Sequence, residues 1–145
     1  MVGHLAGWSY FESINNPENR DFIAKWHAFT KNPKRVTNDP MESAHILFHM
    51  WVQAVEQAGT ADVNAVRQAM IGQKVKSPSG VEVTMLSNHH MAKPVMIGEI
   101  RADGQFAIVY QSKPAWSPYV EANKGKVADW AYPWVCGGCT APKYN

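Results

Sequence analysis

The feature that most constrains the fold is an Asp103-Gly104 pair between two alternating apolar segments. The first segment is Val95–Ile100 and the second is Phe106–Tyr110. An Asp-Gly pair in this setting is the strongest short-range signal for a β-hairpin, because these residues tolerate the positive φ angles of a tight turn. The sequence therefore predicts two paired antiparallel strands late in the chain.

Two helices are predicted from caps and apolar spacing. Asn16-Pro17 is typical of a helix start, and Lys31-Asn32-Pro33 ends that helix. The second helix begins at Asp39, which we expect to act as an acidic cap with Glu42 three residues on, and it ends before Gly59. The expected buried stripes are Phe22, Ile23, Trp26 and Phe29 in the first helix, and Ile46, Leu47, Met50, Trp51, Ala54 and Val55 in the second.

A third, shorter helix fits Asp62–Ile71, with Val63, Val66 and Met70 facing inward. After Gly72 the apolar period changes from 3.6 to 2, and Val81, Val83 and Met85 predict a half-buried strand. The opening segment, Val2–Phe11, is predicted as one further strand that runs into a loop. The predicted class is α/β.

The three helices have wide apolar stripes, yet the predicted strands are few and short. Such helices need a sheet to cover. We therefore expect the C-terminal part of a larger α/β body, with helices packing on a largely missing parallel sheet and a β-hairpin late in the chain. The isolated chain is then expected to be poorly folded or to self-associate through its uncovered apolar stripes.

Composition excludes several classes of protein. The 145 residues are 46% hydrophobic and 18% charged, which is typical of a folded protein. A formal charge of +2, with scattered basic residues, does not favour a nucleic-acid partner. No apolar run approaches the roughly 20 residues of a membrane-spanning helix. The first residues, MVGHLAGWSYF, lack the pattern of a secretory signal.

Long ungapped segments of the chain carry a family resemblance. They are GWSYFESINNPENRDFIAKW, VTNDPMESAHILFHMWVQAVEQAGTADVNAVRQAM and GQKVKSPSGVEVTMLSNHHMAKPVMIGEIRADGQFAIVYQS. Between Gly3 and Tyr119 the chain resembles type I periplasmic substrate-binding proteins that supply urea and short-chain amides to ABC transporters. The resemblance implies two lobes joined by crossing strands, a ligand in the cleft between them, a membrane permease as partner, no cofactor and no enzymatic activity.

The same resemblance implies how the chain is organised. Residues 1–12 would form an interlobe strand and hinge, and residues 13–75 the helical part of the first lobe. Residues 76–112 would form the crossover and hairpin of the second lobe, and residues 113–145 an aromatic and proline-rich tail. It implies a periplasmic location and only the C-terminal portion of a complete binding protein.

Four residues are candidates for ligand binding. Trp8 and Tyr10 follow the expected crossing strand, and an aromatic ring with a hydroxyl suits a small planar amide. The alternative is that both pack at the hinge. Asp39 and Glu42 lie at the start of the second helix, where carboxylates could accept amide N–H groups. The alternative for this pair is a helix-capping role.

Two further patterns allow metal or redox chemistry. His45 and His49 are four residues apart on one helical face, but the glutamate of the HExxH pattern is absent and no third ligand is evident. Cys136 and Cys139 have CxxC spacing, for which we prefer a local disulfide over half of a zinc site. A metal-dependent enzyme using His45, His49 and His89 or His90 is one alternative function. An amide or amino-acid sensor on the same fold is another.

Overall fold

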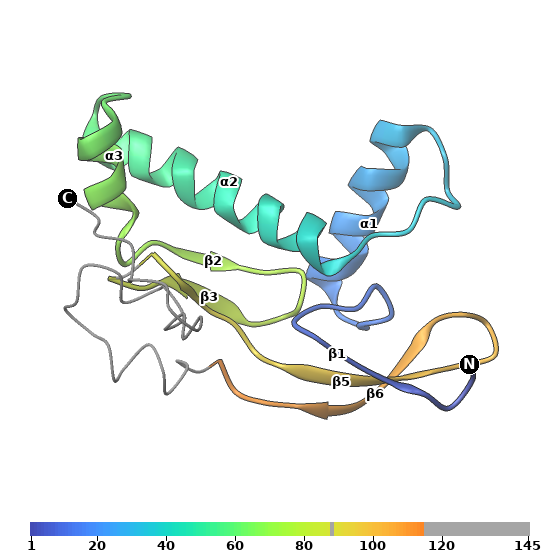
Figure 1. Cartoon of the computed structure of the whole chain (residues 1–145). Coiled ribbons are helices and arrows are strands. Elements are labelled where there is room, and N and C mark those ends of the chain that lie inside the picture. The colour runs from blue at the N-terminus through green and yellow to red at the C-terminus, as the bar shows by residue number, and fades with distance from the viewer. Residues whose placement is uncertain (88, 115–145) are drawn as a thin grey trace, which may run out of the picture.

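The computed structural model describes residues 1–87 and 89–114. Figure 1 shows a layer of helices above two small sheets. The helices are α1 (Pro17–Thr30), α2 (Asp39–Ala58) and α3 (Val63–Met70). The strands are β1 (Leu5–Trp8), β2 (Lys74–Lys76), β3 (Glu82–Met85), β4 (Met91–Ala92), β5 (Met96–Ile100) and β6 (Phe106–Gln111). The order of three helices followed by the late hairpin agrees with the sequence-based expectation.

The predicted hairpin is confirmed and belongs to a three-stranded antiparallel sheet. Its order is β1-β5-β6, so the opening strand pairs with the first strand of the hairpin. Gly104 has a φ of 80°, which suits glycine in the turn. At Gly98, a side-chain Cβ would lie 2.8 Å from a ring carbon of Phe11, so glycine is required for this close approach.

The second sheet has the order β2-β3-β4 and is also antiparallel. The strand near Val83 was predicted, whereas the short strands β2 and β4 were not. In Figure 1, α2 lies across β2 and β3. The main core forms between this helix and the sheet, and it consists of Ile46, Met50, Val83 and Met85. Ala54 of α2 forms a smaller core with Val66 and Ala69 of α3.

Each helix begins at a side-chain cap. Asn16 accepts the backbone N–H of Asn19 at 2.7 Å, and Asp62 caps α3. The expectation that Asp39 caps α2 is wrong, because Asn38 accepts the N–H of Met41 and Asp39 is the first helical residue. The carboxylate of Asp39 is therefore available for a different interaction.

The predicted inward face of α2 is only partly correct. Ile46, Met50 and Ala54 are buried, whereas Leu47 and Trp51 are exposed. Phe29 of α1 and Val63 of α3 are exposed as well, contrary to expectation. The described strands are short and all antiparallel, so they cover one face of α2 and leave its other apolar flank open. None of the described helices combines the length and apolar composition needed to cross a membrane.

A candidate ligand pocket at the start of helix α2

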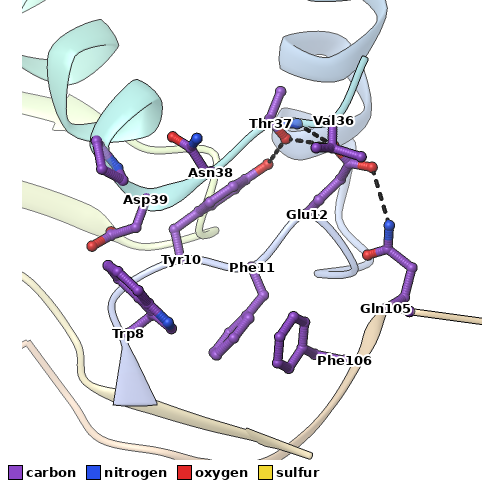
Figure 2. Close-up of a pocket in the computed structure, with 12 residues that line it drawn as sticks. Trp8, Tyr10, Phe11, Glu12, Val36, Thr37, Asn38, Asp39, Gln105 and Phe106 are labelled. Carbon is purple, nitrogen blue, oxygen red and sulfur yellow. Dashed lines mark hydrogen bonds between the residues drawn. The ribbon is translucent and has the colours of Figure 1, made fainter. Parts of the chain in front are cut away.

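A pocket of about 390 Å³ lies where the chain leaves β1 and meets the N-terminal end of α2. Figure 2 shows side chains from three separate segments around it. Its lining comprises Trp8, Tyr10, Phe11, Glu12, Val36, Thr37, Asn38, Asp39, Pro40, Gly104, Gln105 and Phe106. Three of the four predicted ligand-binding residues, Trp8, Tyr10 and Asp39, therefore lie around one cavity. Their role in binding stays a prediction.

Aromatic rings form one wall of the pocket. Trp8 is 50% exposed, so part of its indole surface remains accessible. The rings of Phe11 and Phe106 lie with their centroids 4.6 Å apart, and the glycine at position 98 permits this packing. Such surfaces suit a planar group that stacks against a ring.

Tyr10 contributes its ring to the pocket, but its hydroxyl is committed elsewhere. The side chain is only 2% exposed. The hydroxyl donates to Asn19 Oδ1 at 2.7 Å and lies 2.7 Å from Thr37 Oγ1. Burial is the main cause that raises the pKa of Tyr10 well above its ordinary value, so the phenol stays neutral. The hydroxyl therefore joins the segment after β1 to α1 and to the loop before α2, and a role for it in ligand binding stays a prediction.

Glu12 completes this polar network. Its Oε2 accepts the backbone N–H of Thr37, and it also accepts the Thr37 hydroxyl at 2.9 Å. Gln105 Nε2, at the hairpin turn, lies 3.4 Å from Glu12 Oε1. The carboxylate thus joins the loop before α2 to the hairpin across the pocket (Figure 2). Sequence reasoning missed Glu12 and Gln105, because 93 positions separate them and no local pattern links them.

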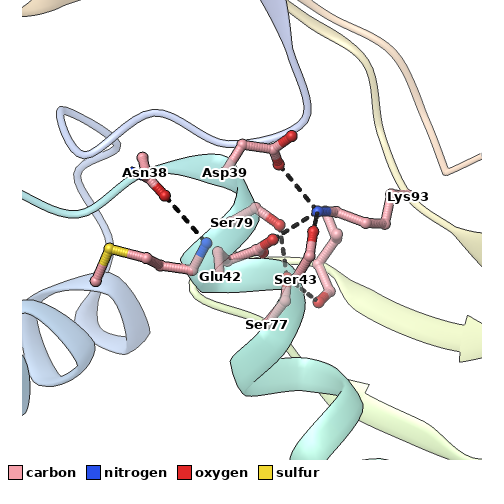
Figure 3. Close-up of polar contacts among 9 residues, drawn as sticks. Asn38, Asp39, Glu42, Ser43, Ser77, Ser79 and Lys93 are labelled. Atoms are coloured by element: carbon pink, nitrogen blue, oxygen red, sulfur yellow. Dashed lines mark hydrogen bonds and ion pairs between the residues drawn. The ribbon is translucent and has the colours of Figure 1, made fainter.

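A mostly buried lysine, Lys93, joins Asp39 to Glu42 (Figure 3). Lys93 Nζ lies 3.1 Å from Asp39 Oδ1 and 2.6 Å from Glu42 Oε2, and it donates to Ser43 Oγ at 2.8 Å. The Lys93 side chain is 11% exposed and that of Glu42 is 0% exposed. Burial raises the pKa of Glu42, and the pairing with Lys93 opposes this shift.

The two carboxylates predicted to bind ligand at the start of α2 therefore differ in their access to the pocket. Asp39 lines the pocket, whereas Glu42 is fully buried and is not part of the lining. Oε1 of Glu42 is buried with no hydrogen-bond partner among the described residues. Lys93 was not predicted, because it follows Asp39 by 54 positions.

The two helical histidines lie side by side on α2. The ring centroids of His45 and His49 are 4.4 Å apart, and His45 also packs against Phe22 at 4.9 Å. Burial, followed by the proximity of His49, lowers the pKa of His45. Across residues 1–87 and 89–114, no three His, Cys, Asp or Glu side chains form a group that could hold a metal ion. The predicted disulfide between Cys136 and Cys139 lies outside the described residues.

Comparison with known proteins identifies the class to which this arrangement belongs. Residues 1–124 match the family model described as periplasmic binding protein domain. The chain belongs to this family, and its α/β structure corresponds to part of a type I periplasmic-binding-protein fold.

Solved structures support the fold. A solute-binding protein of an ABC transporter from Rhodopseudomonas palustris, in complex with p-hydroxybenzoic acid, is 24% identical and superposes with a TM-score of 0.68. The match covers 79% of this chain and 32% of that protein. A leucine-binding protein from Thermotoga maritima is 16% identical with a TM-score of 0.63, and the match covers 78% of this chain and 31% of that one.

One curated relative has an enzyme name. The limonene hydroxylase of Geobacillus stearothermophilus is 32% identical over 112 residues, which are 77% of this chain and 20% of that protein. The chain thus spans about a fifth of this relative and about a third of the matched structures. The family and the matched structures are solute-binding proteins.

Proposed function

We propose that this chain is part of the substrate-binding component of an ABC transporter, which captures a small polar amide such as urea or acetamide in the periplasm and delivers it to a membrane permease. The observation that carries the amide assignment is the chemistry of the pocket. Aromatic rings lie beside carboxylate and amide groups, and no lysine, arginine or histidine is part of the lining among the described residues.

This lining favours N–H donors over carboxylates. The matched R. palustris protein is in complex with p-hydroxybenzoic acid, a carboxylic acid. An ionised carboxylate entering the pocket of this chain would meet Asp39 and Glu12 without a lining cation. Like charges at such short range disfavour a ligand, whereas an amide N–H pairs strongly with a carboxylate oxygen.

Acetamide and acetate test this assignment because they have nearly the same shape. We expect acetamide to shift the indole N–H resonance of Trp8 in an NMR titration, and acetate to shift it much less. Millimolar affinity is expected, because the chain spans a third of the matched two-lobed proteins. The indole of Trp51, outside the pocket, is the internal control. Stronger binding of acetate would refute the amide assignment.

A variant pair locates the site. Trp8→Ala should weaken acetamide binding roughly tenfold, because it removes the accessible ring. His49→Ala should leave the affinity unchanged, because His49 is exposed on α2 and does not line the pocket. If only the histidine variant lost binding, the ligand would lie elsewhere on α2.

A further inference from the structure

The charged groups around the pocket are mainly acidic. Asp39 and Glu12 line it, and Glu42 lies one helical turn from Asp39. The ion pair with Lys93 supplies one positive charge beside these three carboxylates. The N-terminal end of α2 adds the equivalent of about half a positive charge. The sum of the charges on these groups is therefore negative.

This balance does not depend on the ionisation of Glu42. Burial raises the pKa of Glu42 and favours its neutral form. If Glu42 carries a proton, Asp39 and Glu12 still face one lysine and the helix end. A ligand that brings a positive charge is then favoured over a neutral ligand of the same shape.

We propose that this pocket, besides the neutral amide, also binds a planar, N–H-rich cation of the guanidinium or amidinium type, and that it binds this cation more tightly than the neutral amide of the same shape. This inference rests on the proposed function, because it concerns the ligand class of the same pocket. Trp8 and Asp39 are the two side chains that would recognise such a group.

The orientation of Asp39 suits a planar cation. Lys93 engages Oδ1 of the carboxylate at 3.1 Å and fixes its direction. Asp39 and Trp8 both line the pocket, and Figure 2 draws both side chains around it. A guanidinium or amidinium group stacked on this ring can therefore donate N–H groups to the carboxylate, and such charge-assisted hydrogen bonds are about twice as strong as neutral ones.

The Trp8 ring adds a second source of preference. Tryptophan offers the best aromatic face for a cation, since the electron-rich face of the ring attracts positive charge. The half-exposed indole is accessible to such a ligand. A neutral amide can stack on the same face but gains no comparable electrostatic attraction.

Two isosteric pairs test the inference on the 145-residue chain. Guanidinium is compared with urea, and acetamidinium with acetamide, at concentrations far below those that unfold proteins and at matched ionic strength. Binding is followed through the Trp8 indole and the backbone amide of Gly104, which also lines the pocket. We expect each cation to bind roughly tenfold more tightly than its neutral partner. Tetramethylammonium, a cation without N–H groups, should bind more weakly than guanidinium.

Two variants assign the preference to these side chains. Asp39→Asn should reduce the preference for guanidinium over urea to the part that the Trp8 ring supplies, whereas the matched control Asp21→Asn, at an exposed position of α1, should keep the full preference. Trp8→Leu, with binding followed through the backbone amide of Gly104, should also reduce the preference for guanidinium over urea, because it removes the aromatic face that attracts the cation.

The outcomes separate this inference from the proposed function. If acetamide and urea bind as well as their cationic partners, the inference is wrong while the amide assignment stands. Binding of tetramethylammonium as tight as that of guanidinium would also overturn it. If none of the four planar ligands shifts the pocket resonances, both proposals fail.

Discussion

The first turn and the middle of α2 differ in how the chain surrounds them. The first turn is enclosed by polar partners from distant segments, with Lys93 bridging Asp39 and Glu42. The middle of the helix packs on β3 along one face, but its flank exposes Leu47, Phe48 and Trp51. We refer to these three residues as the apolar flank.

This difference shows that the described residues satisfy the polar groups of α2 better than they cover its apolar side chains. Most buried polar groups beside the first turn of α2 have partners within the chain, with Glu42 Oε1 as an exception, because leaving such groups unpaired costs more than exposing an apolar side chain. The apolar flank has no covering sheet among the described strands, which are short and antiparallel. The chain therefore completes the polar contacts beside the pocket more fully than it covers the apolar flank.

The largest expected effect on stability is at Lys93, the partner of the buried Glu42. Lys93→Met should lower the free energy of unfolding by about 3–5 kcal/mol, because Glu42 would be left buried without its cation. Thermal unfolding followed by circular dichroism measures this loss. The deficit should shrink as the pH falls, because burial already raises the pKa of Glu42 and protonation removes the unpaired charge.

The matched control is Lys74→Met, which breaks an exposed ion pair with Glu82 and should cost no more than about 1 kcal/mol. Adding Glu42→Gln to Lys93→Met should restore part of the lost stability. Equal losses of unfolding free energy in Lys93→Met and Lys74→Met would show that the Lys93–Glu42 pair contributes no more to stability than an exposed ion pair.

The second largest loss of stability is expected for Tyr10→Phe. The variant removes the hydroxyl that joins Asn19 and Thr37 and leaves buried polar atoms without a partner. We expect a loss of about 1–3 kcal/mol in thermal or chemical unfolding. Tyr110→Phe, at an exposed position of β6, should be close to neutral. If acetamide affinity fell tenfold in folded Tyr10→Phe, the hydroxyl would have a direct role in binding.

Substitution on the apolar flank should change association more than stability. Trp51, which is 48% exposed, and Phe48 belong to a patch that we expect to drive self-association. The double variant Phe48→Lys/Trp51→Lys should be more monomeric in sedimentation velocity, with a stability change of about 1 kcal/mol or less. Gln53→Lys adds a charge at another exposed position of α2 and should leave association unchanged. Unchanged association in the double variant would place the contact elsewhere.

The smallest expected effect is a pH dependence from His45. Burial and the nearby His49 lower the pKa of His45 below its unfolded value of about 6.5, so the folded state binds fewer protons. Stability should therefore be greater above that pH and decline as the pH falls toward the folded pKa. NMR titration of the imidazole protons measures this pKa. His49→Gln should raise it part of the way, and a value above 6.5 in the unmodified chain would contradict the argument.

The sequence alone predicted the three helices and the late hairpin, but not the short strands β2 and β4. The Asp103-Gly104 hairpin, the Asn16 cap and the terminator Gly59 were all found, because each depends on a few neighbouring residues. At the start of α2 the cap was assigned one residue too late, since Asn38 and Asp39 can both accept a helix N–H. Trp8, Tyr10 and Asp39 were singled out by residue type and position.

The tertiary structure determined which of these side chains line the pocket and which have their polar groups in internal hydrogen bonds or ion pairs. Lys93 and Gln105 reach the site from 54 and 93 positions beyond their partners, and no periodic pattern encodes such a distance. The fold also decided that Ile46 and Met50 are buried while Leu47 and Trp51 are not, although all four belong to one apolar stripe. Helical spacing fixes the direction of a side chain relative to its helix, whereas burial depends on what the rest of the chain places against it.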